Sequence, residues 1–301
     1  MKLSYVQFEV LFLVYQGSDG IQPNSIYSAL PQFSKEVIIS ETNNLLSHQC
    51  LYWENELLQV TEIGIVALEQ YRVKRAVIVA AGFGSRMLPV TETVPKPLVS
   101  VNGKRFIETQ IDALLNAGIT DITVVRGYKA EKFDALLAQY PMLSFIENSE
   151  YATKNNIQSA YLARHKLEDA YLIESDLFIN NLSIIRPFEY RTHFCGTAVA
   201  ETNDWHFLVR DDAIVSCKFG QQTSCYQYIG LSFWTAGHGK MLALDLEEAL
   251  KKEKNHQHFY EAIPFDFFKH RYHLYMRTLN NDDVIEVDTY QELQTLDSSY
   301  R

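Results

Sequence analysis

Two patterns of hydrophobic and polar positions divide the chain near residue 73. In the first part, apolar segments with helical or hairpin spacing alternate with short polar turns. The predicted order is helix, helix, helix, hairpin and helix, with the hairpin turning at Glu54-Asn55. In chain order these elements cover 4–16, 22–30, 34–49, 51–60 and 61–71. We therefore expect residues 1–73 to form a small domain of helices and one hairpin.

In the second part, apolar strands alternate with amphipathic helices. The segment "AVIVAAG" is an uninterrupted apolar run, which is typical of a strand buried on both faces of a parallel sheet. In "RFIETQIDALLNAG" the apolar residues recur at helical spacing up to Gly118, a helix stop. The alternation continues to residue 176 and indicates βαβ units. We predict an α/β fold over residues 74–301, with a Rossmann-like, doubly wound, mixed and mostly parallel sheet.

The element order of residues 1–73 resembles the winged helix-turn-helix modules of bacterial regulators. Contacts from Lys and Arg to phosphates dominate affinity for nucleic acid. This segment holds three Lys or Arg and eight Asp or Glu, so its net charge is −5. We therefore expect no sequence-specific DNA binding, and we expect a docking, dimerising or regulatory module instead.

The composition limits the class of protein. About 47% of the 301 residues are hydrophobic, which provides for a core, and the net charge of −10 is a poor match to nucleic acid. The four cysteines lack metal-binding spacing and indicate a reducing compartment. No apolar run reaches the roughly 18 residues of a membrane span, and the N-terminus is a poor signal peptide. We expect a cytoplasmic protein without a membrane partner.

A glycine-containing loop, "VAAGFGSRMLPVTETVPKPLV", follows the first strand of the second domain, where ligands bind in such sheets. Gly82 and Gly84 allow backbone amides to approach an anion. Met87 stands where a dinucleotide fingerprint needs its third glycine, and the Walker sequence is absent. Arg86 and Lys96 add two cations, which suit a triphosphate that must meet a second phosphate.

The segments "AAGFGSR" and "PKPL" together resemble the signature of nucleotidyltransferases that make nucleoside-diphosphate sugars and alcohols. In that family the glycine loop covers the nucleotide, the arginine meets the triphosphate, and the lysine meets the α-phosphate and the acceptor phosphate. The resemblance implies that Arg86 and Lys96 are catalytic. It also implies that the loop binds the nucleotide through Ala80, Ala81, Gly82, Gly84 and Ser85.

Carboxylates that follow apolar strands are candidate ligands of Mg²⁺, which prefers oxygen donors. Asp176 ends "YLIESD", where the family keeps its first metal aspartate, and Asp288 in "VIEVDTYQEL" is the second candidate. Asp288 could instead cap the next helix, but Thr289 and Glu292 already have the spacing of a capping box. Two nearby carboxylates are weaker candidates: Glu174 and Glu286.

Six stretches between about residues 76 and 296 resemble the bacterial CTP:phosphocholine cytidylyltransferases. They are "AVIVAAGFGSRM", "TVPKPLVSVNG", "NSEYATKNNIQSAYLA", "YLIESDLFIN", "YIGLSFW" and "VIEVDTYQEL". The resemblance implies CTP and phosphocholine as substrates and Mg²⁺ as cofactor. Sugar-specific relatives have a P-L-G-T-A type segment where this chain has "NNIQSA", so Asn156 and Ser159 are candidates for contact with the base or ribose.

A quaternary ammonium cannot donate a hydrogen bond, so it is held by aromatic faces and a nearby carboxylate. The resemblance places such a box on "GLSFW" and "QHFYEAIPFDFF". The candidates are Trp234, Tyr260 and Glu261, with Tyr151 behind them. Each aromatic ring could instead belong to the core, because the chain has 17 Phe and 18 Tyr and most of them must be core residues.

We expect an enzyme that transfers the cytidylyl group of CTP to phosphocholine, giving CDP-choline and pyrophosphate. One alternative is the same chemistry on a sugar 1-phosphate or another phosphomonoester. A second is a transcription regulator whose α/β domain senses a nucleotide, against which the acidic residues 1–73 argue. The four residues Arg86, Lys96, Asp176 and Asp288 favour turnover. The oligomeric state and the role of the first domain stay open.

Overall fold

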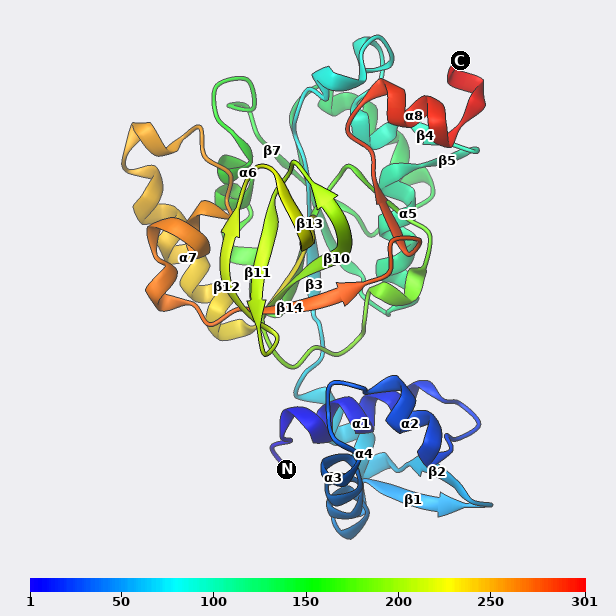
Figure 1. Cartoon of the computed structure of the whole chain (residues 1–301). Helices are drawn as coiled ribbons and strands as arrows, with labels where there is room; N and C mark the ends of the chain where they lie inside the picture. The colour runs from blue at the N-terminus through cyan, green and yellow to red at the C-terminus, as the bar shows by residue number, and fades with distance from the viewer. The chain divides into compact units, whose positions relative to one another are not determined.

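The computed structural model describes residues 1–301, which form two compact units (Figure 1). The first unit comprises Met1–Arg72 and Phe188–Tyr190, and the second comprises Val73–Pro187 and Arg191–Arg301. The chain therefore first passes from one unit to the other next to the predicted boundary at residue 73. The short segment Phe188–Tyr190 was not predicted to belong with the first unit, because it lies far along the chain from residues 1–73.

The first unit contains four helices and a hairpin in the predicted order. They are α1 (Tyr5–Gln16), α2 (Pro23–Ala29), α3 (Lys35–Ser47), β1 (Leu51–Glu54), β2 (Leu57–Val60) and α4 (Glu62–Glu69). Ser4, Ser34 and Thr61 cap α1, α3 and α4 by accepting hydrogen bonds from first-turn amides. The hairpin turns at Asn55 and Glu56, one residue later than predicted, and both have positive φ angles, of 47° and 66°. That the unit is a winged helix stays a prediction.

Aromatic rings explain why Phe188–Tyr190 belongs to the first unit. Phe188 is fully buried in its core, edge-on to Phe12 and Tyr15 at centroid distances of 6.2 and 5.3 Å. Tyr190 stacks on Tyr71 at 5.2 Å. Buried rings of this size contribute a large share of the apolar area of a small core. The core of the first unit is thus incomplete without this later segment of the chain.

A nine-stranded mixed sheet forms the centre of the second unit, in the order β10-β14-β12-β11-β13-β8-β3-β6-β7. The strands are β3 (Arg75–Ala80), β6 (Asp121–Arg126), β7 (Ser144–Glu147), β8 (Ala170–Glu174), β10 (His193–Thr202), β11 (His206–Arg210), β12 (Ala213–Lys218), β13 (Gln222–Trp234) and β14 (Tyr275–Leu279). The block β8-β3-β6-β7 is parallel, as the alternating pattern predicts. β13 runs antiparallel to β8 and joins this block to the remaining strands.

Helices cover both faces of the sheet (Figure 1). They are α5 (Phe106–Asn116), α6 (Asn156–Leu162) and α7 (Ala236–Leu250). The last helix, α8 (Tyr290–Leu296), packs in a separate small core that contains Met87 and Val101. Ile78 of β3 packs in the core on the α5 side, whereas Val77 and Val79 pack in the core with α6 and α7. This alternation confirms the predicted doubly wound arrangement. No helix of either unit has both the length and the apolar character needed to cross a bilayer.

Shorter elements connect this framework. The minor strands are β4 (Ser100–Val101), β5 (Lys104–Arg105), β9 (Leu177–Ile179) and β15 (Val284–Glu286). The short helices are η1 (Ser85–Met87), η2 (Val90–Glu92), η3 (Lys96–Leu98), η4 (Ala130–Ala138), η5 (Arg164–Lys166), η6 (Leu182–Ile184), η7 (Glu253–Asn255), η8 (Ile263–Phe267), η9 (Lys269–Arg271) and η10 (Ser298–Tyr300). β9 pairs antiparallel with β15, with Leu177 opposite Glu286. That pairing brings the segment after β8 next to the C-terminal region of the chain.

Candidate active site

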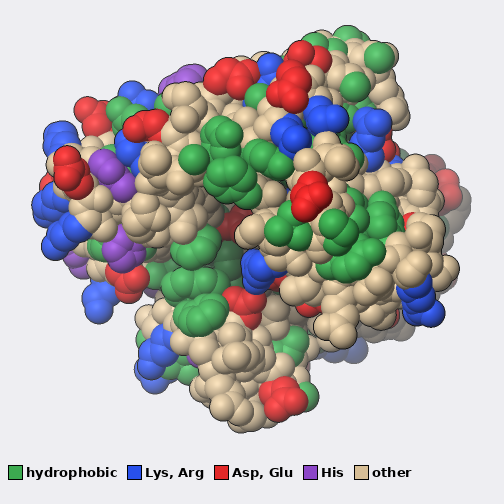
Figure 2. Space-filling model, turned by 90° about the horizontal axis from the view of Figure 1, so that it is seen from above, with side chains coloured by type: hydrophobic (Ala, Val, Ile, Leu, Met, Phe, Trp, Pro, Cys, Tyr) green, Lys and Arg blue, Asp and Glu red, His purple; other side chains and the backbone are tan.

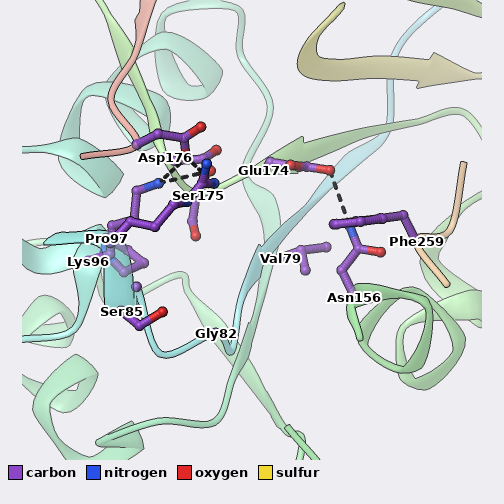
Figure 3. A pocket seen from close by; sticks show the side chains of 13 residues that line it. Val79, Gly82, Ser85, Lys96, Pro97, Asn156, Glu174, Ser175, Asp176 and Phe259 are labelled. Carbon is purple, nitrogen blue, oxygen red and sulfur yellow. Dashed lines mark hydrogen bonds and ion pairs between the residues drawn. The ribbon is translucent and has the colours of Figure 1, made fainter. Parts of the chain in front are cut away.

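A cavity of about 280 Å³ lies where β3 and β8 end, and we call it the nucleotide-side cavity. Figure 3 shows side chains from distant segments that point into it, and Figure 2 shows the hollowed face on which it opens. Its lining includes eight residues that the sequence singled out for nucleotide, metal or catalysis: Gly82, Gly84, Ser85, Arg86, Lys96, Asn156, Asp176 and Asp288. The fold therefore brings the predicted catalytic and metal-binding residues together.

The loop after β3 takes its shape from Gly84. This residue has a φ angle of +61°, and a Cβ atom added to it would lie 2.8 Å from the Cβ atom of Lys96. A larger residue would therefore be strained and would collide with the lysine. Thr91 fixes the loop by donating its hydroxyl to the Gly84 carbonyl at 2.9 Å. A Cβ atom at Gly82 would meet nothing within 4 Å, so this side of the loop is open.

Lys96 lies between two carboxylates. Its Nζ atom is 3.1 Å from Asp176 Oδ2 and 2.9 Å from Asp288 Oδ1 (Figure 3). Burial lowers the pKa of Lys96, but the two aspartates outweigh it, and the net shift is upward. The side chain is therefore a fixed ammonium. Arg86 reaches the same Asp288 oxygen at 2.7 Å, but its side chain is 66% exposed, which leaves it free to turn toward a ligand.

Three carboxylates form a cluster that fits a divalent cation. Ligand oxygens of Asp176, Glu286 and Asp288 all lie within 4.8 Å of one another. The cluster is held by the pairing of β9 with β15 and by a hydrogen bond of 3.1 Å from the Val287 amide to the Asp176 carbonyl. Burial, followed by repulsion from Asp176 and Asp288, raises the pKa of Glu286 well above its usual range. A bound cation would remove that repulsion.

Two further observations agree with Mg²⁺ at this cluster. Asp176 Oδ1 is buried and has no hydrogen-bond partner, so it is a donor oxygen without a protein contact. Thr289 and Glu292 form the capping box of α8, as predicted, so the Asp288 side chain is not needed as a cap. An all-oxygen donor set of this kind suits Mg²⁺. We conclude that the residues present fit the ion that the sequence predicts.

A second cavity, of about 40 Å³, adjoins the first, and we call it the acceptor-side cavity. Glu174 and Phe259 line both cavities. The other residues of its lining are Asp204, Trp205, Tyr228, Gly230, Glu261 and Glu286. Four acidic and three aromatic side chains thus surround a space with no lysine or arginine in its lining. Such a space suits a small cation.

Glu261 is the most deeply buried acid of this second cavity. Its Oε1 atom accepts a hydrogen bond of 3.0 Å from the Tyr228 hydroxyl, whereas Oε2 is buried without a partner. Burial raises the pKa of Glu261 and also that of Glu174, for which repulsion from Glu261 adds to the shift. Gly230 makes room for Glu174, because a Cβ atom there would lie 2.9 Å from the Glu174 Cβ atom. A cation in this cavity would stabilise both carboxylates.

Trp234 does not line either cavity, which corrects its prediction as an acceptor contact. It is fully buried, its indole nitrogen donates to Ser232 Oγ at 3.0 Å, and it pairs with Ala170 at the start of β8. Because β13 runs antiparallel to β8, its residue Gly230 lies beside the site and Trp234 lies at the opposite end. The motif "GLSFW" therefore contributes its glycine and not its tryptophan.

Two tyrosines of the predicted acceptor box also lie outside the cavities. Tyr260 is fully buried, and its hydroxyl contacts Tyr228 at 2.9 Å and Ser232 at 3.2 Å. Its neighbour Glu261 does line the acceptor-side cavity, as predicted. Tyr151 packs against the rings of Phe83 and Tyr128 and against Gly127, and it lines neither cavity.

Three residues predicted to bind the nucleotide, Ser159, Ala80 and Ala81, do not line the nucleotide-side cavity. The Ser159 hydroxyl is buried and accepts a hydrogen bond of 3.0 Å from Asn148, so it is directed into the core. The side chains of Ala80 and Ala81 are also buried and line neither cavity. Asn156 lines the nucleotide-side cavity, but its amide already donates to Glu174 Oε1 at 3.1 Å and accepts from the Tyr260 amide at 2.8 Å. Its partner Glu174 lines both cavities.

Sequence reasoning missed Trp205, Phe259, Asp204 and Tyr228, which line the acceptor-side cavity. Trp205 and Asp204 precede β11, and Tyr228 lies within β13. Their meeting depends on the antiparallel pairing of β11 with β13, and no local motif marks that pairing. The one available signal was the position of Phe259 next to the predicted pair Tyr260-Glu261.

Comparison with known proteins shows which family the chain belongs to. The family described as Nucleotidyl transferase matches residues 75–190. The chain is 37% identical over 229 residues to the 2-aminoethylphosphonate cytidylyltransferase of Lancefieldella rimae, covering 75% of this chain and 92% of that protein. It is 31% identical to the choline-phosphate cytidylyltransferase of Streptococcus pneumoniae, covering 74% of this chain and 96% of that protein.

A solved structure agrees with these sequence matches. The CTP:phosphocholine cytidylyltransferase of Streptococcus pneumoniae aligns with a TM-score of 0.71 at 29% identity, covering 76% of this chain and 100% of that chain. The chain therefore belongs to the nucleotidyltransferase family, and it is an enzyme. Within that family, the relatives that match over about three quarters of the chain are cytidylyltransferases, which supports an enzyme over a nucleotide-sensing regulator.

Proposed function

We propose that the enzyme transfers the cytidylyl group of CTP to a small acceptor that carries a phosphorus acid at one end and a cationic nitrogen at the other. The observation that carries this proposal is the contrast between the two adjoining cavities. One offers Lys96 and Arg86 beside a carboxylate cluster, and the other offers four carboxylates without a lysine or arginine in its lining. The relatives that act on choline phosphate and on 2-aminoethylphosphonate support it.

The reaction is an in-line displacement at phosphorus. An oxygen of the acceptor's phosphonate or phosphate attacks the α-phosphorus of CTP, and the bond from that phosphorus to the bridging oxygen of pyrophosphate breaks. The attacking oxygen is already ionised, so no general base is needed. Lys96 is placed to stabilise charge that develops around the α-phosphorus, and Arg86 is placed to bind the departing pyrophosphate. Bound to Asp176, Glu286 and Asp288, Mg²⁺ would neutralise charge on the phosphate oxygens.

For the acceptor we propose 2-aminoethylphosphonate in preference to the phosphocholine that the sequence predicts. A primary ammonium has three N–H donors, which match the unpartnered Glu261 Oε2 and the neighbouring carboxylates. A trimethylammonium has no donor and would leave those oxygens unpaired. A cavity of about 40 Å³ is also small, since a single water already needs roughly 10–15 Å³ of cavity volume.

Phosphocholine stays the second candidate, on a separate observation. Trp205 and Phe259 present aromatic rings at the acceptor-side cavity, and their faces can contact the methyl groups of a quaternary ammonium. The pneumococcal phosphocholine enzyme also shares the fold over most of this chain. A sugar 1-phosphate has no cation to offset the four carboxylates, so we do not favour it.

A substrate matrix tests the proposal. Pyrophosphate release is measured with CTP, UTP, GTP and dTTP against 2-aminoethylphosphonate, phosphocholine, phosphoethanolamine and glucose 1-phosphate. We expect the highest kcat/KM for CTP with 2-aminoethylphosphonate. Faster turnover of phosphocholine would assign the second candidate. Fastest turnover of glucose 1-phosphate would contradict the role of the acceptor-side cavity.

A further inference from the structure

Behind the metal cluster, α5 presents a buried glutamine to the backbone that carries Asp176. Gln110 is 0% exposed. Its side-chain amide nitrogen donates to the Glu174 carbonyl at 3.1 Å and to the Leu177 carbonyl at 2.8 Å. These two carbonyls lie on either side of Ser175 and Asp176, where the chain turns from β8 to β9. One side chain therefore holds both ends of the turn.

The side-chain nitrogen of Gln110 makes hydrogen bonds, whereas its side-chain oxygen makes none. Both partners are carbonyl oxygens, so the NH₂ group must face them and the side-chain oxygen must face away. That oxygen, Oε1, is buried and has no partner. A buried acceptor without a hydrogen bond is unfavourable, and a hydrocarbon side chain of similar size would avoid it. What distinguishes Gln110 from such a side chain is its two donated bonds.

The neighbouring residue, Thr109, anchors a different part of the segment that runs from β8 to β9. The Thr109 hydroxyl accepts a hydrogen bond of 3.0 Å from the Ile179 amide and donates to the Phe106 carbonyl at 2.7 Å. Thr109 thus fixes the end of β9, whereas Gln110 fixes residues 174–177. Because Thr109 hydrogen-bonds to this segment at Ile179, the turn at Asp176 depends on the two hydrogen bonds from Gln110.

We propose that Gln110 is a positioning residue, which fixes the backbone turn so that the carboxylates of Asp176 and Glu174 stay aimed at the metal cluster and the acceptor-side cavity. Partners that orient metal ligands typically change metal affinity by about 10- to 100-fold when they are lost. The proposal rests on the proposed function for its catalytic consequence. Its structural consequence, a looser turn, does not depend on any substrate.

The test uses the full chain with Gln110→Leu, which keeps much of the volume and removes both donors. The matched control is Gln158→Leu, since Gln158 is also a buried helical glutamine but donates to the Glu150 carboxylate. Hydrogen exchange is measured over a peptide that spans residues 174–179. A titration with Mn²⁺ alone, and the Mg²⁺ concentration for half-maximal rate, are measured on the same proteins.

We expect Gln110→Leu to exchange faster over 174–179, to bind Mn²⁺ more weakly, and to need about 10- to 100-fold more Mg²⁺, whereas Gln158→Leu behaves as wild type in all three. Unchanged exchange and an unchanged Mg²⁺ requirement in Gln110→Leu would overturn the proposal. Failure of the substrate matrix would leave the exchange result intact, so the two proposals fail separately.

A second variant guards against simple loss of the fold. Gln110→Asn keeps the amide but is shorter, so it cannot reach both carbonyls, and we expect an intermediate shift in exchange and in Mg²⁺ requirement. If Gln110→Leu and Gln110→Asn both fail to fold while Gln158→Leu folds, Gln110 acts in fold stability and the positioning role is refuted.

Discussion

The two cavities share Glu174 and Phe259 but differ in the cations that they offer to a ligand. The nucleotide-side cavity has the cations Arg86 and Lys96 in its lining, whereas every charged side chain in the lining of the acceptor-side cavity is acidic. A phosphate can pair with the two cations of the first cavity, whereas the carboxylates of the second repel a phosphate and attract an ammonium. Under the proposed function, this difference would orient a zwitterionic acceptor with its phosphorus acid toward the nucleotide and its nitrogen away from it.

Neutralising the carboxylate cluster should have the largest effect on turnover. We expect Asp176→Asn and Asp288→Asn each to reduce kcat on the order of 10³-fold, because a neutral amide is a poor ligand for Mg²⁺. The fold should persist, as circular dichroism and thermal unfolding would report. Asp211→Asn is the matched control, since Asp211 lies in a hairpin turn at a φ angle of 48°, which asparagine tolerates. Wild-type turnover in either cluster variant would remove that residue from the metal site.

Removal of the two cations should have the next largest effect. We expect Arg86→Ala and Lys96→Ala to lower kcat/KM about 10²-fold, with Lys96→Ala acting chiefly on kcat, because its contact with the α-phosphate strengthens in the transition state. Steady-state kinetics with CTP varied would separate the two parameters. A normal kcat in Lys96→Ala would assign charge stabilisation to another group.

The pH dependence of acceptor binding tests the role of the carboxylates in the acceptor-side cavity. Burial raises the pKa of Glu261, so its charged form appears only above that raised value, and KM for a cationic acceptor should fall as pH rises through it. We expect Glu261→Gln to raise KM for the acceptor about 10-fold at high pH and to remove this part of the pH dependence. The ratio of the two KM values, wild type to variant, cancels the titration of the acceptor itself. A ratio that does not change with pH would contradict the role of Glu261.

The aromatic residues give the smallest and most discriminating effects. We expect Phe259→Leu to raise KM for the acceptor about 3- to 10-fold with little change in stability, since Phe259 lines both cavities and is 42% exposed. Trp234→Phe should instead leave KM unchanged and lower the free energy of unfolding by about 1–3 kcal/mol, because Trp234 is a core residue. Denaturant unfolding and steady-state kinetics would measure both. The reverse pattern would restore the sequence-based assignment of Trp234.

The contrast between the cavities also explains what the sequence could predict. The nucleotide-side cavity is built from segments with local signatures: a glycine loop after a buried strand, a lysine between prolines, and carboxylates directly after apolar strands. Their chemistry can be predicted without the fold, because the carboxyl ends of parallel strands lie at one edge of the sheet. Gly82, Gly84, Arg86 and Asp176 lie at the cavity for that reason, whereas Asp288 reaches it through the antiparallel pairing of β15 with β9.

The acceptor-side cavity depends on strand pairing and direction, which local patterns do not specify. Trp234 was misplaced because the antiparallel direction of β13 was unknown, and that direction brings Gly230 to the site instead. Trp205 and Tyr228 meet through the pairing of β11 with β13. The same limit applies to Phe188. It belongs to the first unit because it packs against residues that precede it by more than a hundred positions in the chain.

The most direct test of the central claim compares two acceptors that differ only at the far end. The rate of CTP consumption is measured with 2-aminoethylphosphonate and with n-propylphosphonate, in which a methyl group replaces the ammonium. We predict that kcat/KM falls on the order of 10²-fold or more without the ammonium, because the buried carboxylates then stay unpaired. Equal kcat/KM values for the two acceptors would contradict the claim that the acceptor-side cavity binds a cationic nitrogen.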